Sequence, residues 1–201
     1  MRVGVLGGTF DPIHLGHLKI AEEARLKLDL ERVLFIPTGQ PRLRTDKYLS
    51  PVADRLRMVE LATSDNPYFQ VCDNEMRRGG PTYTVDTLIE LRGSLGTDAS
   101  LYFIVGVDVL RRFHDWKEPE RVLELCNVVV VTRPGHEDFD WPAWLVTFPQ
   151  AADRLTWLDT TMVDISGTEI RRRSGQGKSV RKLVPASVAE YIQERNLYTQ
   201  Q

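Results

Sequence analysis

The chain has 201 residues, of which 42% are hydrophobic and 27% are charged. These proportions are ordinary for a globular protein and too apolar for a disordered chain. The 26 Lys and Arg residues almost balance the 28 Asp and Glu residues, which gives a net charge of -2. A general nucleic-acid-binding protein would carry a basic excess, so we expect no nucleic-acid partner. The balance still permits a small pocket for a phosphorylated metabolite.

The length predicts a single domain spanning residues 1–201, with a C-terminal helical part from about residue 166. Two cysteines, Cys72 and Cys126, are too few for a disulfide framework, and their apolar surroundings predict buried free thiols. No window reaches the about 18 apolar residues of a membrane span, and glycines interrupt the first apolar run too early for a signal peptide. We therefore expect a cytoplasmic protein without a membrane partner, while the oligomeric state stays open.

Apolar runs and helical periodicities alternate along the chain. The runs predict strands at residues 2–8, 32–36, 68–73, 101–107, 128–132 and 162–165. Apolar residues at helical spacing predict helices at residues 15–28, 51–63, 85–91 and 119–125, one that opens at 166–169, and a last one around 188–192. Ser50 is expected to cap the second helix, with Pro51 at its first position. Residues 136–155 show no clean period.

Strands separated by helices predict an α/β fold, with an open parallel sheet flanked by helices on both faces. In such sheets, ligands bind beyond the carboxyl ends of the strands, at the point where the strand order switches direction. Candidate functional residues are therefore expected directly after each strand.

The first strand is followed by the segment GGTFDPIHLGH, which begins at Gly7. It contains neither the G-x-G-x-x-G of dinucleotide-dependent oxidoreductases nor the GK[ST] of P-loop enzymes, and this weakens both of those classes. Gly7 and Gly8 let the backbone approach a ligand, and the following helix directs N–H groups and a partial positive charge at it. His14 and His17 share a face near the first turn of that helix, and Gly16 leaves room for a phosphate chain.

Two other interpretations of this histidine pair are possible. The two rings could cap the helix or pack against it without touching a ligand. They could also form a zinc pair, but no further His or Cys has suitable spacing for that role.

The segment GGTFDPIHLGH resembles the His-x-Gly-His signature of a nucleotidyltransferase superfamily, in which a phosphate attacks the α-phosphate of ATP and pyrophosphate leaves. The segment ISGTEIR, from Ile165 to Arg171, resembles the second signature of that superfamily, Ile-Ser-Ser-Thr-x-x-Arg, which grips the triphosphate. It departs from the pattern at Gly167, where a second serine is usual. Arg171 matches the signature arginine, whereas Arg172 and Arg173 are expected on a solvated face. The same segment also fits a helix capping box.

Within that superfamily, the chain resembles the nicotinate-nucleotide adenylyltransferases along nearly its whole length. The supporting segments are PTYTVDTL at 81–88, FIVGVD at 103–108, WK at 116–117, VTRPG at 131–135, and VAEYI with a later LY at 188–198. The resemblance implies a Rossmann-like nucleotidyltransferase fold. It also implies that ATP and nicotinate mononucleotide react to give deamido-NAD and pyrophosphate, with Mg²⁺ carried on ATP. Adenylylation of nicotinamide mononucleotide or of phosphopantetheine is an alternative, and so is non-catalytic sensing of an adenine nucleotide.

The resemblance further implies which residues form the site. The expected catalytic residues are His14, His17 and Arg171. The residues expected to bind ATP and its phosphates are Gly7, Gly8, Thr9, Phe10, Gly16, Arg44, Gly106, Asp108, Ile165, Ser166 and Thr168. The residues expected to bind nicotinate mononucleotide are Thr82, Tyr83, Thr84, Trp116 and Arg133.

Elementary chemistry is consistent with several of these roles. Trp116 offers a flat partner for a pyridine ring, although an exposed-loop tryptophan is often a packing residue. The helix entrance at Tyr83 offers N–H donors for a carboxylate. Asp108 fits ribose hydroxyls or Mg²⁺, or else a helix N-cap. Leu43 and Arg44 stand where the family usually has His and Lys, so only the positive charge of that loop is kept.

The expected mechanism needs no covalent intermediate, because the incoming phosphate is already an anionic nucleophile. Positioning and charge neutralisation then do the catalysis. We expect His17 to be the main hydrogen-bond donor in the transition state, with His14, Thr9 and the helix N-terminus beside it.

Overall fold

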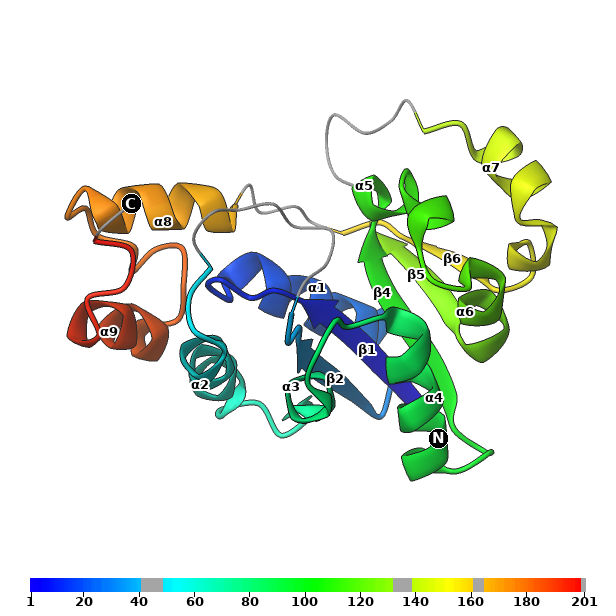
Figure 1. Cartoon of the computed structure of the whole chain (residues 1–201), viewed down its shortest axis with the longest axis horizontal. Coiled ribbons are helices and arrows are strands. Elements are labelled where there is room, and N and C mark those ends of the chain that lie inside the picture. The colour runs from blue at the N-terminus through cyan, green and yellow to red at the C-terminus, as the bar shows by residue number, and fades with distance from the viewer. Residues whose placement is uncertain (41–48, 132–138, 161–164, 200–201) are drawn as a thin grey trace.

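A six-stranded parallel sheet forms the centre of the computed structural model, which describes residues 1–40, 49–131, 139–160 and 165–199 (Figure 1). The strands are β1 (Arg2–Gly8), β2 (Arg32–Pro37), β3 (Phe69–Val71), β4 (Ser100–Gly106), β5 (Asn127–Val131) and β6 (Leu155–Leu158). Their order is β3-β2-β1-β4-β5-β6, and every neighbouring pair is parallel. The switch point therefore lies between the carboxyl ends of β1 and β4.

Helices connect the strands and cover both faces of the sheet. They are α1 (Leu15–Lys27), α2 (Val52–Thr63), α3 (Asn74–Arg78), α4 (Thr84–Leu95), α5 (Val107–Leu110), α6 (Pro119–Leu125), α7 (Trp141–Thr147), α8 (Gly167–Gly175) and α9 (Ala186–Glu194), with short 3-10 turns η1 (Phe113–Asp115) and η2 (Pro149–Ala151). The predicted α/β fold is confirmed. The short helices α3, α5 and α7 were not predicted. With five and four residues, α3 and α5 are too short to show a helical period, and α7 lies in the segment 136–155, whose sequence shows no clean period.

The core divides into two clusters because successive strand residues point to opposite faces. In β5, Val128 and Val130 belong to the cluster that contains Leu88 of α4. Val129 and Val131 belong to the cluster that contains Met58 of α2. A strand that is buried on both faces reads as a continuous apolar run, and this is why β5 was the most visible strand in the sequence.

The sixth strand lies earlier in the chain than predicted. The sheet ends with β6 at Leu155–Leu158, inside and just beyond the segment that showed no clean period. Of the predicted strand at 162–165, residues 162–164 lie outside the described residues, and Ile165 is not in a strand. Because β6 is an edge strand with Trp157 44% exposed, its sequence lacks the continuous apolar run of an inner strand.

Two local predictions also need correction. The N-cap of α2 is Pro51 and the helix starts at Val52, so Ser50 does not cap it. The backbone N–H of Ser50 instead donates to Asp11 Oδ2 at 3.3 Å. Both cysteines are free, but only Cys126 is buried, and burial raises the pKa of its thiol to about 12. Cys72 is half-buried.

The C-terminal part contributes α8 and α9, of which α9 lies beside α2 (Figure 1). The contact between α9 and α2 includes polar bonds, since Tyr191 Oη donates to Asp54 Oδ1 at 2.7 Å and Ser187 Oγ donates to Leu61 O at 3.3 Å. Within the described ranges, no helix combines the length and the apolarity that a membrane crossing requires.

Candidate active site

The glycine-rich end of β1 lies at the switch point, as expected for the start of a phosphate site. Gly7 and Gly8 pair with the last two residues of β2. Phe10 adopts a positive φ of 48° and its side chain is buried, with the ring against Gly8 and edge-on to His17 at a centroid distance of 5.1 Å. Contact between Phe10 and a ligand would therefore come through its backbone. Thr9 is partly exposed.

His14 and His17 together begin α1. His14 is the N-cap residue, and its backbone N–H donates to His17 Nδ1 at 3.2 Å in a capping box. The two rings stack at a centroid distance of 3.7 Å, with the buried Gly16 in the same turn. A backbone N–H can only donate, so Nδ1 of His17 accepts and the N–H of the neutral ring is on Nε2. The two histidines therefore do cap the helix, as one of the alternatives held, and a contact of His17 with a ligand stays a prediction.

The second signature opens α8 and reaches back to the first. Ser166 is the N-cap, and its side chain accepts the Glu169 N–H at 3.2 Å. Arg171 is buried, and its Nη1 donates to the backbone oxygen of Asp11 at 2.8 Å, across 160 residues of sequence. Its Nη2 lies 3.4 Å from Thr168 Oγ1. The two sequence signatures therefore share one site.

Gly167, which replaces the usual serine of the second signature, lies at a sterically crowded position. A Cβ at Gly167 would lie 3.1 Å from Asp11 O, which is tighter than ordinary contact, and 3.4 Å from Arg171 Nη1. The start of α8 thus packs directly on the backbone of the loop after β1. A serine here would require that loop to move by a few tenths of an ångström.

The neighbouring arginines have the solvated role predicted for them. Arg172 and Arg173 are both exposed and pair with Glu169 at 2.8 and 2.7 Å. Their hydrogen bonds lower the pKa of Glu169 to about 2.

The end of β4 completes the switch point. Gly106 is the last residue of β4 and the N-cap of the four-residue helix α5. Asp108 is exposed in the first turn of that helix, so the alternative that Asp108 itself is the N-cap is wrong.

The described residues that are expected to bind nicotinate mononucleotide lie at the start of α4 and just after η1. Tyr83 is the N-cap of α4, and Thr84 is the first residue of that helix. Trp116 follows η1 and is half-buried, with its ring 5.9 Å from Phe103 of β4. A Cβ at Gly7 would lie 3.8 Å from the same Phe103 ring. The Trp116 region therefore adjoins the glycine-rich end of β1.

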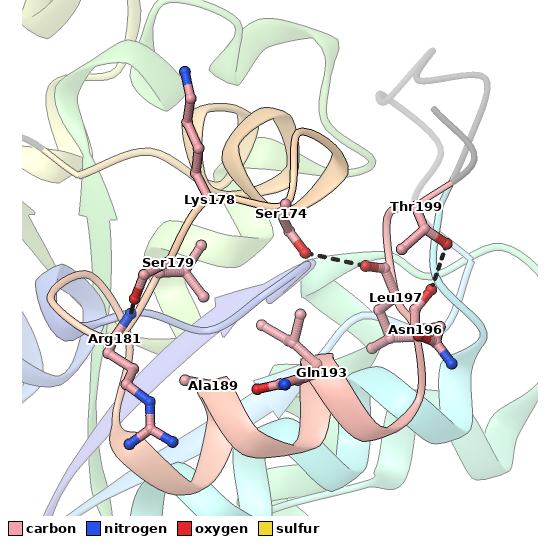
Figure 2. A pocket seen from close by; sticks show the side chains of 12 residues that line it. Ser174, Lys178, Ser179, Arg181, Ala189, Gln193, Asn196, Leu197 and Thr199 are labelled. Carbon is pink, nitrogen blue, oxygen red and sulfur yellow. Dashed lines mark hydrogen bonds between the residues drawn. The ribbon is translucent and has the colours of Figure 1, made fainter.

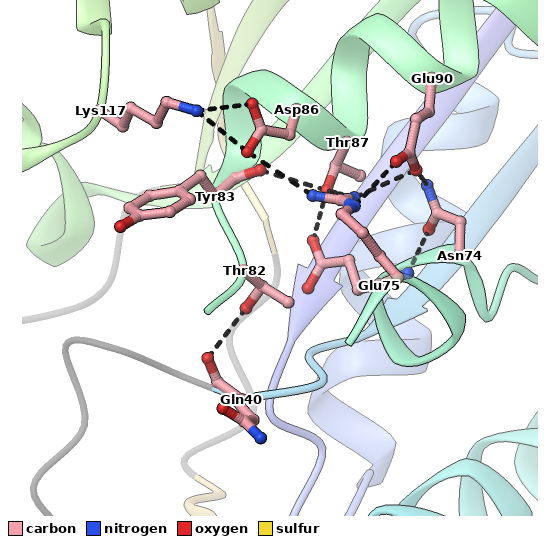
Figure 3. A network of polar contacts seen from close by, with 10 residues as sticks. Gln40, Asn74, Glu75, Thr82, Tyr83, Asp86, Thr87, Glu90 and Lys117 are labelled. Atoms are coloured by element: carbon pink, nitrogen blue, oxygen red, sulfur yellow. Dashed lines mark hydrogen bonds and ion pairs between the residues drawn. The ribbon is translucent and has the colours of Figure 1, made fainter. Parts of the chain in front are cut away.

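An ion pair joins these two elements, as Figure 3 shows. Lys117 Nζ lies 2.9 Å from Asp86 Oδ1 and 5.0 Å from the centroid of the Tyr83 ring. The hydrogen bond to Asp86 raises the pKa of Lys117. Thr82 Oγ1 donates to Gln40 O at 3.1 Å, which connects the entrance of α4 to the loop after β2.

Some expected groups are not placed. Arg44 and Arg133, with Leu43, lie outside the described residues, so their roles stay predictions. In the described part of the chain, no group of three or more His, Cys, Asp or Glu residues could hold a metal ion. Carboxylate ligands that Mg²⁺ would favour are not gathered there, and a supply of Mg²⁺ with ATP also stays a prediction.

Three buried polar residues of this region were not predicted as functional. Asp11 is 3% exposed, and its Oδ1 accepts the hydroxyl of Tyr198 at 2.8 Å. Burial, and next the carboxylate of Asp11, raise the pKa of Tyr198. Arg55 of α2 is completely buried and donates to backbone carbonyls near the site. The sequence held one signal for Arg55, because it lies three and four residues before the buried Met58 and Val59, on the apolar face of a predicted helix.

A separate cavity of about 390 Å³ lies at the other end of α8, between that helix and α9 (Figure 2). Ser174 Oγ donates to Leu197 O at 3.2 Å along its wall. The cavity is lined by the C-terminal end of α8, whereas both signatures meet at the N-terminal end. It therefore does not belong to the candidate active site.

The parallel sheet, its switch point and the meeting of the two signatures define a nucleotidyltransferase. Consistently, a family model described as Cytidylyltransferase-like matches residues 5–173. A relative from Dehalococcoides mccartyi (strain CBDB1) is 46% identical over 198 residues, which cover 98% of this chain and 97% of the relative. A relative from Roseiflexus sp. (strain RS-1) is 45% identical, over 98% of this chain and 97% of the relative. Both are named probable nicotinate-nucleotide adenylyltransferase. The chain belongs to the nicotinate-nucleotide adenylyltransferase family.

Solved structures agree on the fold. The nicotinic acid mononucleotide adenylyltransferase of Plasmodium falciparum, complexed with NaAD, superposes with a TM-score of 0.78 at 19% identity, covering 100% of this chain and 98% of that one. A putative nicotinate-nucleotide adenylyltransferase from Vibrio parahaemolyticus superposes with a TM-score of 0.70 at 18% identity, covering 100% and 96%.

Proposed function

We propose that this enzyme transfers the adenylyl group of ATP to nicotinate mononucleotide, a step of NAD biosynthesis. A phosphate oxygen of the mononucleotide attacks the α-phosphorus of ATP, the bond from that phosphorus to the bridging oxygen breaks, and pyrophosphate leaves with the electron pair. The products are deamido-NAD and pyrophosphate. The observation that carries the proposal is the 2.8 Å bond from Arg171 to the carbonyl of Asp11, which unites two phosphate-binding signatures in one site.

The histidine pair is suited to the transferring phosphate. His17 presents its Nε2–H while its Nδ1 is held by the backbone of His14, so its donor is oriented before the substrate arrives. A fixed donor needs no reorganisation when negative charge grows on the α-phosphate oxygens. The N-terminal N–H groups of α1 add a partial positive charge in the same place. No proton has to move for this stabilisation.

The start of α8 is suited to the outgoing pyrophosphate. Ser166 and Thr168 are exposed at the helix N-terminus, where N–H groups attract anions. Arg171 adds a full positive charge immediately behind them. Mg²⁺, when bound to the triphosphate, would supply further charge neutralisation.

The region around Trp116 and α4 is suited to the mononucleotide. The half-buried Trp116 ring offers a stacking surface, and the first turn of α4 offers N–H donors to a ring carboxylate. An amide substituent carries no negative charge for these donors, so this arrangement favours the acid over the amide. Contacts from Arg44 and Arg133 and a location in the cytoplasm are also part of the proposal.

The test is a comparison of acceptors. The purified protein is given ATP and Mg²⁺ with nicotinate mononucleotide, nicotinamide mononucleotide or phosphopantetheine, and pyrophosphate release is timed. We expect the fastest release with nicotinate mononucleotide. Faster pyrophosphate release with another acceptor would identify that acceptor as the substrate. Binding of the nucleotide without pyrophosphate release in any mixture would indicate a sensor instead of an enzyme.

A further inference from the structure

Arg55 is a completely buried cation that the chemistry above does not use. It lies in the first turn of α2, and its side chain is 0% exposed. The guanidinium donates to four backbone carbonyls: Nη1 to Thr9 O at 2.8 Å and to Thr38 O at 2.7 Å, Nη2 to Gly39 O at 3.0 Å, and Nε to Ser50 O at 3.2 Å.

These carbonyls belong to the loops that form the edge of the site. Thr9 follows β1 and lies within the first signature, and Thr38 and Gly39 follow β2. Ser50 precedes α2, and its own N–H is held by the side chain of Asp11. One planar guanidinium therefore ties together the chain ends of two neighbouring strands. The N–H donors of a guanidinium point in several fixed directions, so one arginine can bind all four carbonyls. The single ammonium group of a lysine cannot reach all four at once.

The loop after β2 is also fixed from its other side. A Cβ at Gly39 would lie 2.7 Å from the backbone oxygen of Glu75 in α3, so the glycine permits a very close approach. The first residues of this loop, Thr38 and Gly39, are thus held between Arg55 and α3.

The bonds to Arg55 also orient backbone donors. In a trans peptide the C=O and the next N–H point in opposite directions. When the carbonyls of Thr9, Thr38 and Gly39 turn towards Arg55, the following N–H groups point away from it. Those N–H groups belong to Phe10, Gly39 and Gln40, which follow the carboxyl ends of β1 and β2.

A role in packing alone would not require a charge at this position. Arg55 shares its helix face with the apolar Met58 and Val59, and an apolar side chain of similar volume commonly stabilises such a face at least as well as a buried ion does. What an apolar side chain cannot do is hold carbonyl groups in fixed orientations.

We propose that Arg55 is a positioning residue for adenylyl transfer. From beneath the site, and without touching substrate, it holds the loops after β1 and β2 in the geometry that the reacting phosphates need. The proposal rests on the proposed function, because the rate it concerns is the rate of that reaction.

The test compares Arg55→Met and Arg55→Lys with a matched control, Arg57→Met. Arg57 lies on the same helix but is exposed and pairs with Glu60 at 3.0 Å. Steady-state rates are measured for folded protein, well below the melting temperature of each variant. We expect kcat to fall about 100-fold in both Arg55 variants, because a misplacement of the reacting groups by about 1 Å costs about that much. The KM for nicotinate mononucleotide should change less than about threefold. The Arg57 variant should keep the wild-type kcat.

Chemical rescue adds a second readout. In Arg55→Ala, added guanidinium ion at millimolar concentration should raise kcat several-fold, and the same addition should not raise kcat of the wild type. A purely structural residue would lower the melting temperature and leave kcat per folded molecule unchanged, and that result would overturn the proposal. Loss of the fold in both Arg55→Met and Arg55→Lys would also overturn it. An inactive wild type would instead refute the proposed function itself.

Discussion

Tyr198 provides the most direct test of how the C-terminal part supports the site. Its hydroxyl is buried and donates to Asp11 Oδ1 at 2.8 Å, and the carbonyl of the same Asp11 accepts from Arg171. The variant Tyr198→Phe removes this hydroxyl, which is also hydrogen-bonded to the side chain of Ser50, and keeps the ring. The longer bond from the Ser50 N–H to Asp11 Oδ2, at 3.3 Å, stays in place.

The size of the effect follows from the burial of both partners. Asp11 and Tyr198 are 3% and 6% exposed, so water cannot easily replace the lost donor. A hydrogen bond to a charged group contributes about 1.5–3 kcal/mol, so we expect Tyr198→Phe to lose about 2 kcal/mol of unfolding free energy. For about 200 residues, this corresponds to a melting temperature lower by about 4–8 °C.

Urea denaturation followed by circular dichroism measures this loss, with Tyr68→Phe as the matched control. Tyr68 is exposed, and its ring stacks with Arg25, so its variant should change stability by less than about 0.5 kcal/mol. If Tyr198→Phe is as stable as this control, the Asp11 bond does not support the fold and the reasoning above is refuted.

The same bond predicts a dependence on alkaline pH. The folded state raises the pKa of Tyr198, chiefly by burial, above the about 10 of an unfolded tyrosine. The unfolded chain therefore releases this proton first, and the stabilisation that is complete below about pH 10 is lost as pH rises further. Wild-type stability should fall more steeply above pH 10 than that of Tyr198→Phe. Parallel curves for the two proteins would contradict this.

Three further substitutions test the site itself. His17→Ala should lower kcat about 100-fold or more, because it removes a hydrogen-bond donor to the transition state. The control His114→Ala changes an exposed histidine and should leave kcat unchanged. If the two variants have the same kcat, His17 has no part in the mechanism. Trp116→Ala should raise KM for nicotinate mononucleotide far more than KM for ATP, and equal increases in steady-state assays would mean that Trp116 is structural. Gly167→Ser should lose about 1 kcal/mol in urea denaturation, because its Cβ would lie 3.1 Å from Asp11 O, and an unchanged midpoint would show that the loop yields freely.

Much of the fold could be predicted because inner strands are buried on both faces. The four valines of β5 read as a continuous apolar run, and the strand was found almost to the residue. The edge strand β6 has the exposed Trp157 and no such run, so its place was predicted wrongly. Local periodicity detects burial, and an edge strand is only partly buried.

The candidate site, like the fold, has a part that the sequence predicts and a part that it does not. The histidines and Arg171 could be predicted because each signature is local in sequence. The contacts that join them to the rest of the molecule could not, since Asp11 meets Arg171 across 160 residues and Tyr198 across 187. A local pattern contains no information about which distant residue closes such a bond.

Arg55 and Asp11 nevertheless share a property that a sequence can reveal. Arg55 interrupts the apolar face of α2. Asp11 is buried, and in the sequence it lies between the buried apolar residues Phe10 and Ile13. A charged group buried among apolar residues is unfavourable unless hydrogen bonds compensate for the loss of water. Both residues meet that condition by binding backbone groups of the loops that begin at the strand ends. A charged residue in a predicted apolar face is therefore a reason to look for a side chain that fixes the backbone of a binding site. The rates of the Arg55 variants measure whether that expectation holds here.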